Sequence, residues 1–345
     1  MRGLRKFLTP FAPDQSGAVS VLYELGGILV ICDAGGCTGN ICGFDEPRWH
    51  TCRSAVFSAG LRDMDAILGR DDKLVAELVD AGTKLDAKFA CIVGTPVPSV
   101  IGTDYRALRR MAEKQLDYPI LTVDTTGMEL YDIGAEKAYL ELMRRFAKEQ
   151  LPVEPGRVGV LGVNPLDMSD LKAAEKIQKC VPGAICYGMG STLEDVISAS
   201  AAEKNIVAAP DGLKAAKYLN EKFGTPYEVY DPLAESLLLE RDYAGKRILV
   251  IDQQVRANTM RALLLERGAA SVTCATWFLH LTDLAQSGDV RLKEEDDFEE
   301  LVMQGGFDLL IGDGTLWRIV PDYTGETVSM PQFPVSGDLG GDERD

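Results

Sequence analysis

Histidine is nearly absent from this chain of 345 residues, which contains only His50 and His280. A metal site built mainly from imidazole ligands is therefore excluded. Basic residues are also scarce, because 36 Lys and Arg stand against 53 Asp and Glu, and the formal net charge is −17. Nucleic-acid binding needs concentrated Lys and Arg, so this composition argues against it. The same charge disfavours anionic membrane surfaces.

Long apolar runs are missing as well. No uninterrupted run approaches the ~20 residues that a membrane-spanning helix needs. The stretch from Gly17 to Ile31 comes nearest, but Glu24 interrupts it and Asp33 follows at once. It also has no convincing small-residue cleavage site. We therefore expect a cytoplasmic protein without a membrane partner, in which thiols remain reduced.

The chain has no glycine-rich fingerprint for a dinucleotide. After the strand expected at 247–251, the turn reads Asp252-Gln253-Gln254-Val255, without a glycine that would admit a pyrophosphate. Gly159 and Gly162 offer only a weak spacing, so we expect neither NAD nor FAD. A phosphate-binding loop is absent too, and any ATP hydrolysis must come from a partner.

Strand-like and helix-like segments alternate along the chain, which is typical of parallel sheets with crossover helices. The apolar runs predict strands at 28–31, 89–93, 118–123, 157–162, 184–187, 206–209, 247–251, 271–275 and 307–311. Helical spacing predicts helices at 73–85, 103–115, 135–150, 169–180, 212–223 and 256–267.

The predicted fold class is α/β, with three Rossmann-like domains that contain mostly parallel sheets. Two prolines and a glycine in Leu151–Gly156 mark the first boundary. We expect domains at 1–150, 151–243 and 244–335, with the third reduced, and a disordered polar tail at 336–345.

Three of the eight cysteines, Cys32, Cys37 and Cys42, are spaced five residues apart in a glycine-rich stretch after the first expected strand. In open α/β sheets, ligands bind at the loops that leave the carboxyl ends of strands. Small residues such as Gly36 and Gly39 let a bulky cluster approach the backbone, whose N–H groups can bond to cluster sulfides. These residues are the candidate iron–sulfur site.

Each candidate also has a simpler interpretation. Cys37 fits a tight loop as a small residue, Cys42 can be a buried apolar group, and Cys32 ends an apolar strand as core residues do. Asp33 is either a ligand or a turn residue. Cys91 lies inside an apolar strand, and we expect it to serve packing alone.

A charged and aromatic group follows the cysteine loop, formed by Glu46, Arg48, Trp49 and His50. These side chains either line a substrate pocket or form a surface turn with one buried aromatic ring. Composition favours the surface turn.

The sequence resembles the nitrogenase component 1 superfamily, whose relatives include protochlorophyllide reductase and nickel-sirohydrochlorin reductive cyclase subunits. Gly36-Cys37 and the glycine-rich turn are similar to the cluster-binding loop of that superfamily. Further similar segments are Ser16–Ala18, Ser58–Gly69, Val100–Asp104, Gly188–Asp195 and Phe307–Gly312. The likeness runs through most of Gly17 to Pro334.

This resemblance implies a [4Fe–4S] cluster shared across the interface of a dimer. The dimer is either a homodimer or a heterodimer with a paralogous component 1 chain. The resemblance also implies an ATP-dependent iron–sulfur reductase as the electron donor.

The sequence also departs from the family pattern at several cysteine positions, and these departures limit the function that the resemblance implies. The large nitrogenase subunits use three cysteines per chain for the bridging cluster, and only Cys37 stands at such a position here. The other two positions fall near Pro13 and Pro96, and the metallocluster cysteine falls near Ala209. We therefore do not expect a true dinitrogenase. Two chains that each donate Cys37 and Cys42 would supply the four thiolates that a [4Fe–4S] cluster needs.

Three functions stay open at this stage. The first is an oxidoreductase component that passes electrons from the cluster to a substrate. The second is a non-catalytic scaffold for metallocofactor assembly, and the third is a cluster-free structural partner of a paralogous subunit. The substrate cannot be read from the residues.

Overall fold

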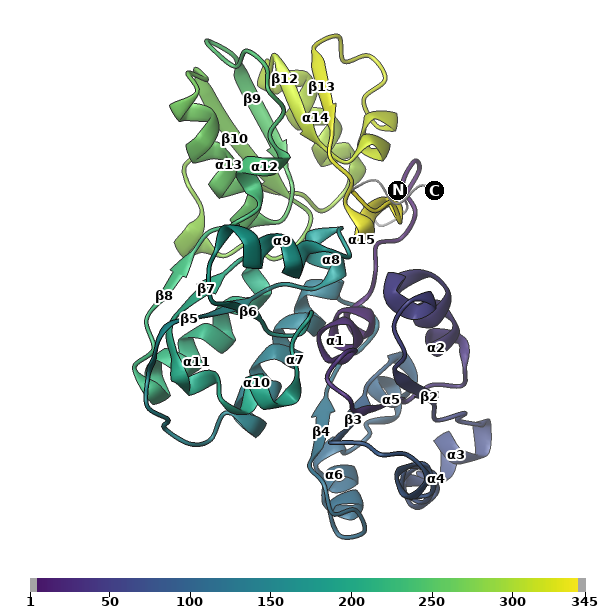
Figure 1. Ribbon diagram of the computed structural model, residues 1–345. Coiled ribbons are helices and arrows are strands. Elements are labelled where there is room, and N and C mark those ends of the chain that lie inside the picture. The colour runs from purple at the N-terminus through teal and green to yellow at the C-terminus, as the bar shows by residue number, and fades with distance from the viewer. Residues whose placement is uncertain (1–4, 341–345) are drawn as a thin grey trace.

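Three separate β-sheets organise the chain, and the computed structural model describes residues 5–340 of it (Figure 1). The first sheet has the order β2-β1-β3-β4. Its strands are β1 (Ile28–Ile31), β2 (Ala55–Ser58), β3 (Ala90–Val93) and β4 (Ile120–Val123). The second has the order β6-β5-β7-β8. Its strands are β5 (Glu154–Leu161), β6 (Ala184–Cys186), β7 (Ala202–Val207) and β8 (Tyr227–Val229).

The third sheet has five strands in the order β11-β10-β9-β12-β13. They are β9 (Arg247–Ile251), β10 (Ser271–Thr276), β11 (Val290–Arg291), β12 (Leu309–Gly312) and β13 (Glu326–Ser329). Every strand pair in the three sheets is parallel. The predicted α/β class with parallel sheets is confirmed. The third sheet has one strand more than either of the other two, and its short edge strands β11 and β13 were not among the predicted strands.

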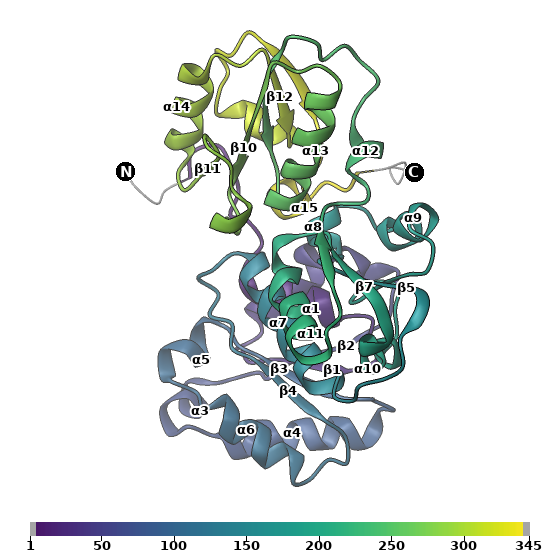
Figure 2. The same cartoon turned by 90° about the vertical axis from the view of Figure 1, so that its left-hand side faces the viewer.

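Helices connect the strands and cover the sheets (Figures 1 and 2). They are α1 (Asp14–Leu22), α2 (Gly36–Asn40), α3 (Asp63–Leu68), α4 (Asp71–Lys84), α5 (Pro96–Ile101), α6 (Tyr105–Glu113), α7 (Tyr131–Phe146), α8 (Pro165–Met168), α9 (Ala173–Cys180), α10 (Leu193–Ile197), α11 (Leu213–Phe223), α12 (Ala234–Leu237), α13 (Gln254–Glu266), α14 (Glu295–Gly305) and α15 (Phe333–Ser336). A π-helical turn, η1, covers Ile41–Asp45, and 3₁₀ turns include η2 (Pro47–His50) and η4 (Pro210–Gly212). None of the helices within residues 5–340 has both the length and the apolar character needed to cross a bilayer.

Helix α1 was not among the predicted helices, and its environment explains why. All nine of its residues are buried. A helix that is buried on every side has no polar face, so it lacks the 3.6-residue pattern by which a helix is found in sequence.

Helices α1 and α7 pack at van der Waals contact through two glycines. A Cβ atom added to Gly17 would lie 1.8 Å from the Tyr131 carbonyl oxygen, and one added to Gly134 would lie 1.7 Å from that of Asp14. Only glycine allows two backbones to approach this closely.

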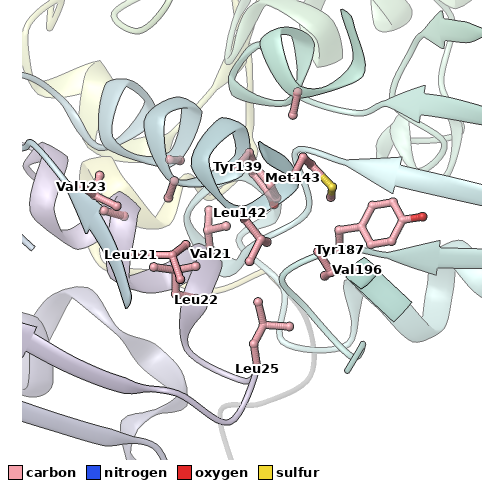
Figure 3. Close-up of a cluster of buried hydrophobic side chains, with 14 of the residues drawn as sticks. Val21, Leu22, Leu25, Leu121, Val123, Tyr139, Leu142, Met143, Tyr187 and Val196 are labelled. Atoms are coloured by element: carbon pink, nitrogen blue, oxygen red, sulfur yellow. The ribbon is translucent and has the colours of Figure 1, made fainter. Parts of the chain in front are cut away.

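The first and second units share one core around these helices (Figure 3). Val21 and Leu22 of α1 and Leu142 of α7 lie in it beside Tyr187 and Val196 from the second unit. The strands of the first two sheets fall on either side of the proposed limit at residue 150, whereas α7 belongs to the packing of both units.

The two ends of the described chain pack against different units, the N-terminal end against the third and the C-terminal end against the second. The backbone N–H groups of Lys6, Phe7 and Leu8 donate to the Glu295 carboxylate of α14 at 2.7–3.1 Å. Ser336 ends α15, and the Gly340 N–H donates to the Ser169 carbonyl at 2.6 Å. Residues 336–340 therefore adopt defined structure, contrary to the expected disordered tail, and residues 341–345 lie outside the described residues.

We predict that Gly134→Ala destabilises the protein, although alanine normally favours a helix by about 1 kcal/mol over glycine. The added methyl group would collide with the backbone of α1, and overpacking of this kind costs about 1–3 kcal/mol. Chemical denaturation measures the change in the free energy of unfolding. Gly39→Ala in α2 is the matched control, because its Cβ would meet no atom within 4 Å. Equal stability of the two variants would contradict the close contact.

Candidate functional site

The cysteine stretch leaves the carboxyl end of β1, as predicted, but most of it is helical rather than a loop. Gly35 opens it with a φ of +117°, which favours glycine, and α2 and η1 follow. We name residues 33–45 the cysteine segment. Its backbone is therefore fixed by internal hydrogen bonds, which the sequence pattern did not indicate.

Asp33 holds the start of the cysteine segment. Its buried carboxylate accepts hydrogen bonds from the Thr38 N–H at 2.8 Å and the Thr38 Oγ1 at 3.0 Å. Ser58 Oγ, from the end of β2, donates to the same carboxylate at 2.6 Å. These contacts correspond to the turn interpretation of Asp33, since three donors already occupy its oxygens.

Asp45 anchors the other end. It accepts from Ser16 Oγ of α1 at 2.7 Å and from Asn40 Nδ2 at 2.8 Å. Burial raises the pKa of this carboxyl. The cysteine segment is thereby tied to α1, and through α1 to the α7 contact.

The three candidate thiols have different surroundings. Cys32 is buried among apolar side chains, and burial raises its pKa to about 12. Cys37 and Cys42 are half-buried. Burial also raises both of their pKa values, and the nearby Asp33 carboxylate adds to the effect at each thiol. Cys91 of β3 is fully buried in the core, as expected for a packing residue.

The glycines of the cysteine segment face open space. A Cβ atom added to Gly35, Gly36, Gly39 or Gly43 would meet no atom within 4 Å. Steric crowding does not explain glycine at these four positions. The segment thus leaves room for a bulky group beside Cys37 and Cys42.

Pro13 and Pro96, which the sequence resemblance led us to compare with family cysteines, both lie near a cavity beside the cysteine segment. Pro13 precedes α1 and lines a cavity of about 800 Å³ together with Asn40, Gly43 and Phe44. Gly127 lines this cavity too, and a Cβ atom on it would lie 2.4 Å from Pro96 Cγ. Pro13 therefore lines the cavity beside the cysteine segment, and Pro96 lies next to a residue that lines it.

Within residues 5–340, no group of three or more His, Cys, Asp or Glu side chains is arranged to hold a metal ion.

The residues after the cysteine segment form a buried ionic network rather than the predicted surface turn. Arg48 is 3% exposed, and its guanidinium donates to both oxygens of Glu46 at 2.7 Å. It also donates to Glu24 at 2.7 Å and to the Ser20 carbonyl of α1 at 2.6 Å. The expected buried aromatic ring was wrong too, because Trp49 is exposed. Paired charges can be buried at low cost, and a sequence does not show which charges will pair.

The Arg48 network also reaches the second unit. The other oxygen of Glu24 accepts from the Gly190 N–H at 2.7 Å. The region that follows the cysteine segment is thus fixed against two units at once, and its role is positional.

A second buried polar cluster lies at the carboxyl ends of the second sheet's strands, and sequence reasoning missed it. Asp167 follows β5 and accepts from Tyr131 Oη at 3.0 Å and from Asn164 Nδ2. Asp211 follows β7 and is fully buried, and its Oδ1 has no hydrogen-bond partner among residues 5–340. Burial raises the pKa of Asp167 to about 7. Burial and the Asp167 carboxylate raise that of Asp211 well above its ordinary value.

Ala209 lies next to this acidic pair and is fully buried. The sequence resemblance led us to expect the metallocluster cysteine of the family near this position, where the methyl group of alanine cannot bind iron. The acidic residue after β7, Asp211, is visible in the sequence as part of Pro210-Asp211-Gly212. This pattern is common where helices begin, so it does not single out a site.

The fold and the site define an α/β protein in which three parallel sheets surround a helix pair and present a cysteine segment beside it. The chain belongs to the Nitrogenase component 1 type Oxidoreductase family, whose sequence profile matches residues 17–235, more than half of the chain. The predicted superfamily is thereby confirmed.

One curated relative is the nitrogenase iron-molybdenum cofactor biosynthesis protein NifE of Clostridium pasteurianum, which is 25% identical over 180 residues. The alignment covers 50% of this chain and 38% of NifE, so the chain spans well under two thirds of that protein.

Two solved structures of nitrogenase Cp1 share the fold. The structure at pH 6.5 has a TM-score of 0.75 at 12% identity and covers 99% of this chain and 89% of Cp1. The structure at pH 5 has a TM-score of 0.70 at 15% identity, with 96% and 85% covered. At these identities the likeness concerns the fold alone.

We predict that Asp211→Asn stabilises the protein at pH 8 and has a much smaller effect at pH 4. A carboxyl whose folded-state pKa is raised stabilises the protein at pH values below its unfolded pKa of about 4. This contribution to the free energy of unfolding is lost as the pH rises toward the folded-state pKa. For this pair the loss extends through about pH 7, the pKa of Asp167. Asparagine mimics the neutral acid, so the melting temperature at pH 8 should rise by at least about 2 °C.

The exposed Asp322→Asn is the control and should show no such pH dependence. A lower melting temperature for Asp211→Asn at pH 8 than for the unmodified protein would contradict the assignment of a buried acid pair.

Proposed function

We propose that this chain is a component 1-type subunit that contributes Cys37 and Cys42 to a [4Fe–4S] cluster shared with a second chain. The observation that carries the proposal is the pairing of two half-buried thiols with four glycines that face open space. Gly36 and Gly39 would let the cluster approach the backbone of α2. Family membership makes an iron–sulfur group the natural occupant of that space.

The raised pKa values of Cys37 and Cys42 bear on how the cluster would bind. Iron binds the thiolate, so ligation releases a proton from each cysteine and becomes weaker as pH falls. When bound, the cluster would supply one-electron transfer. Cys32 is excluded from the proposed ligand set, because its thiol is buried in the core and its pKa is raised further.

An apolar surface beside the cysteine segment supports the proposal that a second chain binds there. Helices α3 and α5 are neighbours, and both expose large apolar side chains, among them Ile67 at 74% and Val100 at 82%. Phe44 of the cysteine segment is 75% exposed. Apolar side chains exposed in one region of a protein typically mark a contact with a partner. We name α3 and α5 the apolar face and propose that it contacts a second copy or a paralogous component 1 chain.

Electrons would come from an ATP-dependent iron–sulfur reductase that docks transiently on the assembled dimer. This chain has no phosphate-binding loop of its own. The product of such a transfer would be a reduced substrate, which makes the dimer an oxidoreductase component, although not a dinitrogenase.

A scaffold for metallocofactor assembly is the second candidate function. The name of the similar NifE protein favours it, since that protein is described by cofactor biosynthesis. A scaffold would hold the cluster at Cys37 and Cys42 but would not turn over a substrate. Substrate reduction by the iron-loaded dimer with a reductase and ATP therefore separates the two functions. A cluster-free partner would bind no iron at all.

We predict that Cys37→Ala abolishes iron binding and leaves the fold intact. The side chain is half-buried in the cysteine segment, so its removal takes away a thiolate but little packing. Iron and sulfide are measured per dimer after anaerobic purification, and far-ultraviolet circular dichroism reports the fold. We expect Cys42→Ala to behave in the same way.

Cys91→Ala is the matched control, since it removes a buried thiol from β3. It should lower the free energy of unfolding by on the order of 1 kcal/mol and keep its iron. Unchanged iron in Cys37→Ala, or loss of iron in a folded Cys91→Ala, would remove the ligand assignment.

We predict that the double substitution Ile67→Asp and Val100→Asp dissociates the dimer. Each carboxylate would have to lose its water in a buried contact, which is costly without a partner charge. Light scattering under anaerobic conditions gives the mass in solution. Val153→Asp is the control, because Val153 is also exposed but lies at the start of the second unit. A dimer that survives the double substitution would exclude the apolar face as the contact.

A further inference from the structure

We infer that the groove between α6 and α7 binds a small anion that carries two or more negative charges. The groove has a volume of about 1040 Å³ and runs along the free edge of β4, the last strand of the first sheet. It lies apart from the cysteine segment and shares no lining residue with the cavity beside that segment.

Helices α6 and α7 both pack against β4, and side chains from both helices line this groove. Figure 2 shows the two helices in the same unit as β4. Leu108 of α6 packs in one core with Ile120 of β4, whereas Leu142 of α7 packs in another core with Leu121. Alternate residues of a strand point to opposite faces of its sheet, so α6 and α7 cover opposite faces of the sheet at β4. Arg145 of α7 forms an ion pair with Glu113 of α6.

Basic side chains from both helices line the groove. Arg106, Arg109 and Arg110 follow a helical spacing of three and four residues, which places them on one face of α6. Lys137 and Arg144 are seven residues apart on α7, and so lie on one face of that helix. Five cations thus stand against the three lining carboxylates of Asp104, Asp124 and Glu141, an excess of two positive charges. This excess is unusual in a chain whose net charge is −17.

The carboxylates in the groove leave the α6 arginines without partners. Asp104 caps α6 by accepting from the backbone N–H groups of Arg106 and Ala107 at 2.9 and 3.0 Å. Glu141 pairs with Arg144 at 3.3 Å. No side chain within residues 5–340 forms an ion pair with Arg106, Arg109 or Arg110.

Guanidinium groups bind phosphate and carboxylate oxygens through two parallel hydrogen bonds, so three unpaired arginines suit a polyvalent anion. The groove volume corresponds to that of small-molecule sites, about 300–1,000 Å³. An acidic peptide added to the β4 edge fits less well. Asp124 and Glu141 would repel its carboxylates, and Lys137 Nζ already donates to the Asp124 carbonyl at that edge.

Calorimetric titration at low salt tests the inference, because salt screens such contacts. Pyrophosphate and citrate are the probes, and the stronger of the two identifies a phosphate or a carboxylate ligand. The groove variant combines Arg106→Gln, Arg109→Gln and Arg110→Gln. The control combines Lys114→Gln, Lys148→Gln and Lys179→Gln, which removes the same charge from exposed positions outside the groove.

We expect the unmodified protein and the control to bind one probe at a saturable site, and the groove variant to bind at least about tenfold more weakly. If the groove variant aggregates, the single changes Arg109→Gln and Lys114→Gln are compared in the same way. Three results would overturn the inference: no saturable binding, equal weakening in groove and control variants, or tighter binding of an oligoglutamate peptide than of either probe. In the first case the arginines would serve only to keep the β4 edge from pairing with other strands.

Discussion

The contact between α1 and α7 at Gly17 and Gly134 is the constraint on which the remaining structure depends. The two backbones lie so close at these glycines that an added Cβ atom would collide with a backbone carbonyl oxygen. Because α7 also packs against α11 and η4, the contact fixes the first sheet against the second. Ser16 of α1 then holds Asp45, and Ser20 holds Arg48, so the cysteine segment takes its position from a helix that has no exposed residue.

The parallel sheets could be predicted because their central strands contain continuous apolar runs, as in Ile28–Ile31 of β1 and residues 248–251 of β9. A strand that is buried on both faces needs no polar alternation, and glycine or proline marks its ends. Short edge strands such as β11 and β13 carry no such run. These edge strands form because a neighbouring strand offers hydrogen bonds to their backbone. That neighbour is set by the tertiary fold, so the sequence of the edge segment alone does not predict the strand.

The site was predictable in part for the same reason. The position of Cys37 and Cys42 after β1 follows from the rule that ligands bind at strand ends. The burial of Glu46 and Arg48 could not be foreseen, since it depends on Glu24 and on the backbone of α1. The pairing of Asp167 with Asp211 likewise joins residues 44 positions apart in sequence, after two different strands. Sequence patterns report periodicity, whereas these networks depend on the tertiary arrangement.

Pro13 and Pro96 give the chain its particular character within the family. Pro13 lines the cavity beside the cysteine segment and Pro96 lies next to it, and neither residue can bind iron. The thiolates that one chain lacks must therefore come from another chain, if a [4Fe–4S] cluster is held there. This requirement links the half-exposed thiols, the open glycines and the apolar face into one account of a shared site.

Native mass spectrometry of anaerobically reconstituted protein tests this account most directly, because it reports chain number and bound cluster in the same ion. The account predicts that the mass of one [4Fe–4S] cluster is carried by a two-chain species, and that the single chain carries none. A single chain that holds a complete cluster would contradict the shared site, since ligands within one chain would then suffice.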